Sequence, residues 1–442
     1  MRTFIKQAKE NGDLVEIDRE VSVELELANV AHALDGRPVL FNHIKGYPGW
    51  RVLSGMCADR RYFSMSLDTP VPELIHHLSR ALDAPQPPPL TDGPAPCQEV
   101  VQEQVDLDQL PILLHTPQDG GYYIASNVVI TEDPELGRNM CYHRLLRLDK
   151  THFAARIVER RGTYNAMQKV EGDLPVAICI GVSNAVHLAA SMSPPPEVDE
   201  LAVANALAPT PLVKCISNDL QVPASAEIVL EGRITRQSTS EGPFMDLTET
   251  MDIVRQQPVI EIDLITHRHN PIFHALLPGG LEHKQLMGMP REPTIFAEVN
   301  RVARCKGVYI TPGGASWLHA VVQIEKQQPD DGRKAIEAAF RGHGSLKHVW
   351  IVDDDIDIYD PMQVEWAMAT RFQADRDLMV MPDMPGSSLD PSGIHAPGEK
   401  SRTAKLGLDC TMPLDGDPVK FKRGEYGMVD VGDYISPEEE SH

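Results

Sequence analysis

The chain has 442 residues and a formal net charge of −23, with 42% hydrophobic and 24% charged residues. This length suggests two or three domains, and the composition is typical of a soluble globular protein. Because nucleic acids and acidic membranes bind to basic faces, the charge argues against both as partners. Any anionic ligand must therefore be met by a local group of arginines or lysines.

The cysteine pattern and the N-terminus indicate a cytoplasmic protein. Seven scattered cysteines include no Cys-x-x-Cys pair, which fits a reducing compartment better than a disulfide framework or a zinc site. The first residues carry charges where a signal peptide has its apolar stretch. The longest apolar run, near residues 174–182, is far short of the roughly 20 residues that span a bilayer. We expect no membrane span.

Residues 1–105 are expected to form an N-terminal α/β domain that ends in a proline-rich linker. Its predicted helices and strands lie near Thr3 and over residues 24–34, 38–41 and 50–53. Six prolines between Pro85 and Pro96 exclude a helix or a central strand. That stretch is therefore expected to be a linker or an extended surface segment.

Residues 106–300 predict a β-rich domain, such as a barrel or split barrel. Short β-branched runs are separated by Pro, Gly and Asp turns. They cover residues 128–131, 177–181, 212–216, 227–232 and 259–265. The alanine-rich stretch 184–192 and the stretch 199–207 are predicted to be helices.

Residues 301–442 predict an α/β domain. Strands over residues 321–324 and 348–352 alternate with helices over residues 333–341 and 362–371. The acidic run Asp353-Asp354-Asp355 ends a predicted strand and lacks the glycine turn and trailing glutamate of a calcium loop, so we interpret it as structural.

The most informative turn is Glu241-Gly-Pro-Phe-Met-Asp246. Glycine followed by proline breaks both helix and strand, so loop geometry must place the two carboxylates. Two carboxylates held close together raise the pKa of one of them, which gives a proton donor usable near neutral pH. The residue types alone favour the other interpretation, two exposed loop acids, because loops are commonly acidic.

A second cluster is Asn139-Met-Cys-Tyr-His-Arg144. Arg144 has the geometry to hold a carboxylate with two hydrogen bonds, and Asn139 offers an oxygen ligand to a hard cation. Five positions apart on a strand, these side chains would face opposite ways unless a bulge intervenes. A surface strand with a salt-bridged arginine is the alternative.

Together these segments resemble the UbiD-type decarboxylases. The resemblance spans nearly the whole chain and rests on residues 214–220, 223–232, 241–244, 352–357, 366–371 and 406–409. It implies a central flavin-binding split barrel, flanked by an α/β N-terminal domain and an α/β C-terminal domain that mediates oligomerisation. The family forms homodimers and homohexamers.

The resemblance also implies a reaction: reversible, non-oxidative decarboxylation of an aromatic, heteroaromatic or α,β-unsaturated acid with prenylated FMN. Such a step needs an external electron sink, because neither Asp nor Arg accepts an electron pair. By similarity, Arg144 orients the substrate carboxylate, Asp246 delivers a proton after CO₂ leaves, and Glu241 tunes that proton transfer. A flavin prenyltransferase would supply the cofactor.

The family's cofactor-binding positions fall on Tyr142, His143, Arg144, Arg160, Arg161, Ser191, Met192 and Arg341. Its metal, usually Mn²⁺ and accompanied by K⁺, would be held by Asn139 and Glu200. The family's third ligand is a histidine, but residues 156–163 contain none. Either Glu159 replaces it, or Arg160 or Arg161 binds the flavin phosphate in place of the metal.

Two other hypotheses remain open from the sequence. The chain could be a subunit of a UbiD-like carboxylase or decarboxylase complex whose metal–cofactor site is altered or absent. It could also be a non-catalytic scaffold, although a scaffold does not need Arg144, Glu241 and Asp246. His343 lies near Arg341 and could reach the cofactor, and Pro278 is expected to line the substrate site.

Overall fold

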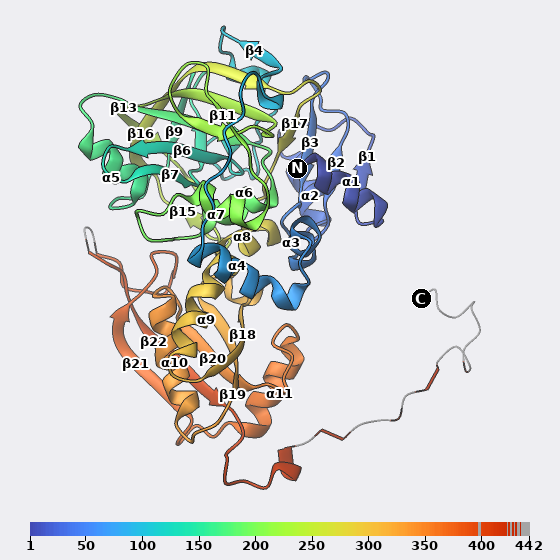
Figure 1. Ribbon diagram of the computed structural model, residues 1–442, viewed down its shortest axis with the longest axis vertical. Helices are drawn as coiled ribbons and strands as arrows, with labels where there is room; N and C mark the ends of the chain where they lie inside the picture. Colours follow the sequence, from blue (N-terminus) through green and yellow to red (C-terminus); the bar gives the residue numbers. More distant parts are fainter. Residues whose placement is uncertain (397–398, 422, 425–426, 428, 431–433, 435–442) are drawn as a thin grey trace.

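The computed structural model is a mixed α/β protein with several domains (Figure 1). It describes residues 1–396, 399–421, 423, 424, 427, 429, 430 and 434. Two lobes are joined end to end, and the lower lobe in Figure 1 is formed by the C-terminal part of the chain. Within the described residues, no helix combines the length and the apolar character that crossing a bilayer requires.

A four-stranded sheet with the order β1-β2-β3-β17 organises the N-terminal part. Its strands are β1 (Val15–Ile17), β2 (Val39–Phe41), β3 (Arg51–Ser54) and β17 (Ile272–His274). The helices of this part are α1 (Arg2–Glu10), α2 (Glu26–Ala33), α3 (Arg60–Leu67) and α4 (Leu74–Asp83). Strand β17 comes from much later in the chain and pairs in parallel with β3, so this sheet is built from two distant segments.

The central part is built on a nine-stranded sheet in which β5-β8-β9-β16-β13-β10-β6-β7 form the main path and β4 pairs with β16. The strands are β4 (Val100–Gln102), β5 (Tyr123–Ile124), β6 (Val128–Asp133), β7 (Gly137–Cys141), β8 (Leu145–Arg147), β9 (His152–Ala155), β10 (Leu174–Ile180), β13 (Ile228–Glu241) and β16 (Arg255–His267). Register shifts at two places bend the long β13–β16 pair. At one of them, a Cβ on Gly232 would lie 2.1 Å from the Glu261 carbonyl oxygen, so only glycine fits.

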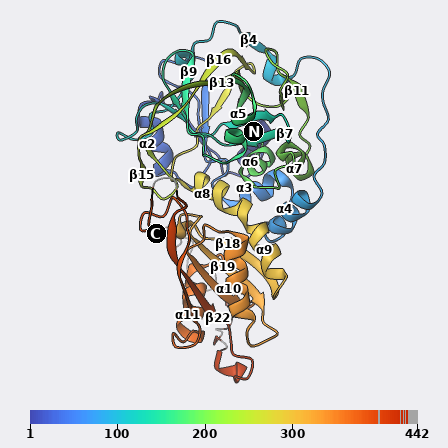
Figure 2. The ribbon, with the colours of Figure 1, turned by 90° about the vertical axis from the view of Figure 1, so that its left-hand side faces the viewer.

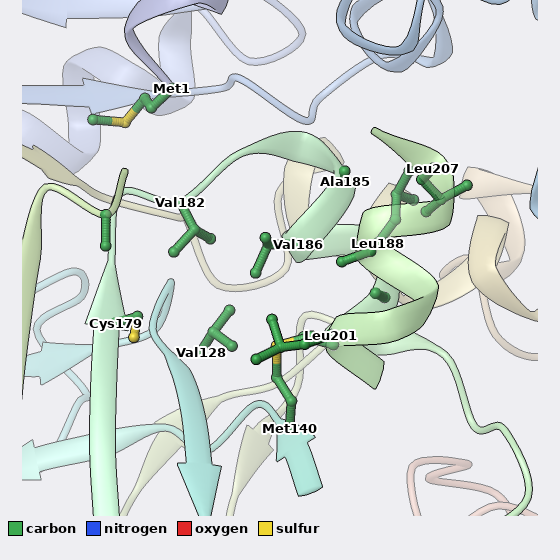
Figure 3. Packing of buried hydrophobic residues seen from close by; sticks show 14 of the residues in the cluster. Met1, Val128, Met140, Cys179, Val182, Ala185, Val186, Leu188, Leu201 and Leu207 are labelled. Atoms are coloured by element: carbon green, nitrogen blue, oxygen red, sulfur yellow. The ribbon is translucent and has the colours of Figure 1, made fainter. Parts of the chain in front are cut away.

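Helices α5 (Gly162–Lys169), α6 (Asn184–Ser191) and α7 (Glu200–Leu207) accompany this sheet. Figure 3 shows Leu201 of α7 close to Val128 of β6 and Met140 of β7, within one buried hydrophobic cluster. Burying such a side chain contributes about 1.5–3 kcal/mol. This packing fixes the start of α7 against β7, where two of the predicted site residues lie.

The C-terminal part has a five-stranded sheet with the order β18-β19-β20-β22-β21. Its strands are β18 (Arg304–Ile310), β19 (His319–Glu325), β20 (His348–Asp353), β21 (Leu378–Pro385) and β22 (Arg402–Cys410). Helices α10 (Asp331–Gly342) and α11 (Pro361–Arg371) belong to the same part. The guanidinium of Arg371 donates to Asp353 and Asp355 at 2.6–2.8 Å, so both carboxylates are used in an internal ion pair.

A helical stretch links the two lobes (Figure 2). It consists of α8 (Leu281–Gly288), the 3₁₀ turn η4 (Met289–Arg291) and α9 (Glu292–Asn300). Near its start, the buried Glu282 carboxylate accepts hydrogen bonds from the backbone N–H groups of Gly55 and Cys57, both at 2.9 Å. Farther along, buried Glu292 pairs with Arg60. The loop before α3 and the first residue of α3 therefore each hold this stretch at one point.

His319, on β19, is expected to make the free energy of unfolding depend on pH in the acid range. Its ring packs against Trp350 at a centroid distance of 4.4 Å, and its Nε2 has no partner among the described residues. Burial lowers its pKa from 6.5 to about 4, so the unfolded chain binds the proton more tightly and stability falls as the pH drops from 6.5 to 4. Replacing His319 with Phe should reduce the slope of the unfolding free energy there by about 1.4 kcal/mol per pH unit.

Urea unfolding over a series of pH values measures this slope. The same change at exposed His43 is the control and should leave the slope unaltered. An unchanged slope for His319→Phe would show that the folded protein protonates His319 as easily as the unfolded chain does.

Candidate active site

Arg144 is the centre of a cluster of three carboxylates. Its Nε donates to Glu241 Oε1 at 2.8 Å and its Nη2 to Glu241 Oε2 at 3.0 Å. Its Nη1 donates to Asp246 Oδ2 at 3.3 Å, and Nη2 also donates to Asp252 Oδ2 at 2.9 Å. Arg144 follows the end of β7 and precedes β8, so strand alternation does not decide where its side chain points. The structure thus brings together the three predicted catalytic residues.

Local structure explains how the acids converge. Glu241 is the last residue of β13, and Asp246 follows the short strand β14 (Phe244–Met245). Strand β14 pairs with β15 (Met251–Asp252), which carries Asp252. Between Glu241 and β14, Gly242 has φ +100°, and a Cβ on it would lie 2.9 Å from the Ile253 carbonyl oxygen. Glycine is required here for both reasons.

The three acids differ in burial. The Glu241 side chain is fully buried, and its Oε1 also accepts a hydrogen bond from the Tyr123 hydroxyl at 3.1 Å. The side chains of Asp252 and Asp246 are 17% and 23% exposed. Asp252 also pairs with Arg255, whereas Arg144 is the only cation that pairs with Asp246 among the described residues. Asp246 is therefore the acid that is best placed to exchange a proton with a bound molecule.

Burial and neighbouring charges shift the pKa values of three groups in this cluster. Burial opposes the charge of Arg144, but its hydrogen bonds and the charge of Glu241 outweigh burial and raise its pKa. Burial, followed by the charge of Glu241, raises the pKa of Tyr123, so Tyr123 stays a neutral donor. Burial would raise the pKa of Asp252, but Arg255 and Arg144 lower it overall. Arg144 and Asp252 are thus a stable ion pair.

His283 also lies at this site, although no sequence motif surrounds it. It lies on α8, and its Nδ1 accepts a hydrogen bond from the Gly279 N–H at 3.1 Å. Burial lowers its pKa, while the nearby charge of Asp246 acts in the opposite direction. A Cβ on Gly279 would lie 3.4 Å from the Asp246 carbonyl oxygen. The turn containing Pro278 therefore reaches the acid cluster.

Two of the residues predicted to bind metal are Asn139, on β7, and Glu200, the first residue of α7. Asn139 Nδ2 is 3.4 Å from Thr163 Oγ1, and Glu200 Oε2 accepts from the Met140 N–H at 2.9 Å. His143 Nε2 also contacts Thr163 Oγ1, at 2.9 Å. Burial raises the pKa of Glu200 to about 8 and lowers that of His143 to about 4. Asn139 and Glu200 are thus brought to neighbouring positions.

This region does not form a complete metal site. Within the described part of the chain, no group of three or more His, Cys, Asp or Glu side chains is arranged to hold a metal ion. Glu159 is exposed. A Cβ on Gly162 would lie 2.0 Å from Asn139 Oδ1, so position 162 has no space for a ligand side chain. The residues present do not fit a three-ligand Mn²⁺ site.

A phosphate group fits the same region better. Helix α5 begins at Gly162, and its N-cap residue Arg161 makes no side-chain cap hydrogen bond. Arg160 and Arg161 are exposed, and neither has a carboxylate within 4.0 Å among the residues that the structure describes. Free N–H groups at a helix start, flanked by cations, bind phosphate well.

The remaining predicted cofactor residues fall in two places. The Tyr142 hydroxyl contacts His187 Nδ1 at 2.5 Å, the Ser191 hydroxyl donates to the His187 carbonyl at 2.8 Å, and Met192 is buried beside them. Tyr142 directly follows β7, Ser191 is the last residue of α6, and Met192 is its C-cap. Arg341 lies apart, at the end of α10, where its 52% exposed side chain pairs with Glu298 at 3.5 Å.

Comparison with known proteins identifies the class. Residues 5–82, 89–281 and 284–410 match the N-terminal, Rift-related and C-terminal domains of 3-octaprenyl-4-hydroxybenzoate carboxy-lyase, UbiD. The chain therefore belongs to the UbiD family and is a decarboxylase of the carboxy-lyase type, which confirms the family predicted from the sequence.

One curated relative and two solved structures are similar to this chain over nearly its whole length. The chain is 42% identical over 418 residues to the anhydromevalonate phosphate decarboxylase of Methanosarcina mazei, covering 93% of this chain and 96% of that one. The UbiD-class enzyme HmfF from Pelotomaculum thermopropionicum, solved in complex with FMN, has a TM-score of 0.93 at 36% identity and covers 98% of this chain and 99% of its own. An evolved dimeric form of HmfF in complex with prFMN has a TM-score of 0.88 at 34% identity and covers 99% of both chains.

Proposed function

We propose that this chain decarboxylates an α,β-unsaturated acid with prenylated FMN, and that Arg144, Glu241 and Asp246 are its catalytic residues. The observation that carries the proposal is the Arg144 cluster, in which one arginine meets a fully buried glutamate and a partly exposed aspartate. A buried ion pair of this kind is costly to build, which favours a functional role for it.

The proposed mechanism assigns one task to each residue. The bound prenylated flavin supplies the electron sink that decarboxylation needs. Arg144 orients the substrate carboxylate, and Glu241 holds Arg144 in place through two hydrogen bonds. Asp246 delivers the proton that replaces CO₂ on the substrate carbon. Burial lowers the pKa of His283 and favours its neutral form, and the charges of His283 and Asp246 interact, so we expect His283 to influence that transfer.

The relatives suggest the substrate. Anhydromevalonate is mevalonate less one water, which makes it an unsaturated acid, and the relatives named for its phosphate match 90% or more of this chain in four of five cases. Among the aromatic, heteroaromatic and unsaturated acids that the sequence leaves open, we therefore favour a phosphorylated unsaturated acid. The complete Arg144 cluster favours a catalytic chain over a cofactor-poor subunit.

Several finer features belong to the same proposal. We propose a split-barrel arrangement of the central sheet, domains at residues 1–105, 106–300 and 301–442, and a homodimer or homohexamer formed through the last of these. The proposed cofactor sites are the start of α5, with Arg160 and Arg161, and the Tyr142–Met192 region. The proposed location is the cytoplasm, with the cofactor supplied by a flavin prenyltransferase.

Co-expression with a flavin prenyltransferase tests the proposal. We expect a bound ligand with the mass and absorption of prenylated FMN, and release of CO₂ from anhydromevalonate phosphate. Protein purified without the prenyltransferase is the control and should carry FMN but release no CO₂. A chain that binds prenylated FMN yet decarboxylates no unsaturated acid would contradict the proposal.

Metal removal should have little effect on FMN binding. The described residues provide no three-ligand site, and two unpaired arginines lie at the start of α5. We expect the Kd for FMN to change less than about twofold after dialysis against a chelator, because guanidinium groups bind phosphate directly. Flavin fluorescence titration measures the Kd. A large loss that Mn²⁺ restores would instead assign metal binding to Asn139 and Glu200 with Glu159.

A further inference from the structure

Arg291 is a partly buried cation that has no hydrogen-bond or ion-pair partner among the described residues. It ends η4, between α8 and α9, in the stretch that links the two lobes. Among the described residues its guanidinium makes no hydrogen bond or ion pair, and its Nε is shielded from solvent with no acceptor in reach. Leaving a guanidinium unpaired in such a place costs free energy, which an anionic ligand would offset.

Among the residues that the structure describes, no carboxylate lies within 4.0 Å of the Arg291 guanidinium to serve as that anion. Its Cζ lies 5.6 Å from the ring centroid of Trp317, and the ring of His343 packs edge-on against Trp317 at 4.4 Å. His343 is buried, and its Nε2 also lacks a partner among the described residues. Burial, and then the charge of Arg161, lower the pKa of Arg291 to about 10. The charge of Arg161 thus acts on Arg291 and has the same sign, so it does not neutralise the guanidinium.

The helical stretch connects this cation to the acid cluster. Lys284 pairs with Glu249, which lies in the turn that begins at Asp246. Lys284 and Arg291 are seven residues apart, so they lie along one side of the stretch, about 10 Å from each other. One side of the stretch formed by α8 and η4 thus carries Lys284, which contacts the Asp246 turn, and Arg291 at its other end.

We propose that Arg291 binds a phosphate monoester on the substrate, at the opposite end of the molecule from the carboxylate that Arg144 orients. The inference rests on the proposed function and names the group that the enzyme recognises. The flavin phosphate is accounted for separately by the start of α5, which belongs to the central part of the chain. Arg291 instead contacts the ring of Trp317, which belongs to the C-terminal part of the chain and packs against His343.

Binding to the FMN-loaded protein tests this inference without turnover, since unmodified FMN leaves the substrate intact. Calorimetry would compare anhydromevalonate phosphate with anhydromevalonate, which lacks only the phosphate. We expect the wild type to bind the phosphorylated acid about 10–100-fold more tightly, as a charge-assisted contact provides. Arg291→Met should remove most of that difference and leave the affinity for anhydromevalonate within about twofold.

The control is Arg301→Met, on an exposed arginine just beyond the end of α9, which should keep the full preference. Arg291→Lys keeps the positive charge and should retain part of the preference for the phosphorylated acid. This variant keeps the inference testable if Arg291→Met fails to fold. An Arg291→Met protein that still prefers the phosphorylated acid would overturn the inference. So would a wild type without any preference.

A third experiment distinguishes the substrate phosphate from the flavin phosphate as the ligand of Arg291. FMN and riboflavin binding are compared in the wild type and in Arg291→Met, and we expect both affinities to be unchanged. Loss of FMN affinity with riboflavin binding intact would place the flavin phosphate at Arg291 and overturn the inference. The proposed function fails by a different result, namely no CO₂ release by the prenylated-FMN enzyme.

Discussion

Replacing Asp246 with asparagine should reduce turnover by about 10²–10⁴-fold, the usual contribution of a positioned general acid. The side chain keeps its size and can still accept a hydrogen bond from Arg144, so the fold and FMN binding should be preserved. Steady-state CO₂ release measures the turnover, and flavin fluorescence measures the binding. The expected loss is in kcat, because Asp246 acts after the substrate has bound.

Asp252→Asn is the matched control for this prediction. Asp252 contacts the same guanidinium and is similarly exposed, but it is held between Arg144 and Arg255. Its loss should loosen Arg144 and affect kcat much less than the change at Asp246. Equal losses for the two variants would show that Asp246 acts only by holding Arg144, and wild-type activity of Asp246→Asn would exclude it as the proton donor.

Replacing Arg144 with methionine should destabilise the protein by about 3–5 kcal/mol as well as abolish activity, because Glu241 would keep a buried charge without its partner. Glu241 is fully buried, and after the change only the Tyr123 hydroxyl would remain as a side-chain donor to it among the described residues. The free energy of unfolding in urea, measured on the flavin-free protein, tests the size of the effect.

The double variant Arg144→Met, Glu241→Gln is the control for that mechanism. Removing the stranded carboxylate should recover a large part of the lost stability while activity stays absent. If the double variant is as unstable as Arg144→Met alone, then lost packing of the arginine, for example against the Phe244 ring 5.0 Å away, explains the destabilisation instead.

Most elements could be predicted from the sequence because their patterns are local. The helix expected over residues 184–192 is α6, and the one expected over residues 333–341 lies within α10. The family and the carboxy-lyase reaction were also predicted, and both are confirmed. The strand-alternation difficulty between Asn139 and Arg144 disappears, because the strand ends at Cys141.

The rest of the site could not be predicted because it depends on contacts between distant segments. Asp252 approaches Arg144 from 108 positions away, and Tyr123 approaches Glu241 from 118 positions away. No motif surrounds Arg291, whose only signal is a missing partner in three dimensions. The assignments of Arg341 and of a metal to the cofactor remain predictions.

The contacts of residues 55–60 with the helical stretch between the lobes affect whether the N-terminal part can fold alone. Glu282 and Glu292 are fixed by Gly55, Cys57 and Arg60, and β17 completes the first sheet. Residues 5–82 are a separate family domain by sequence, yet they are not a detachable module. Removing these residues would take donors away from two buried carboxylates and leave β17 without its partner strand, so we expect this part and the catalytic part to unfold as one cooperative unit.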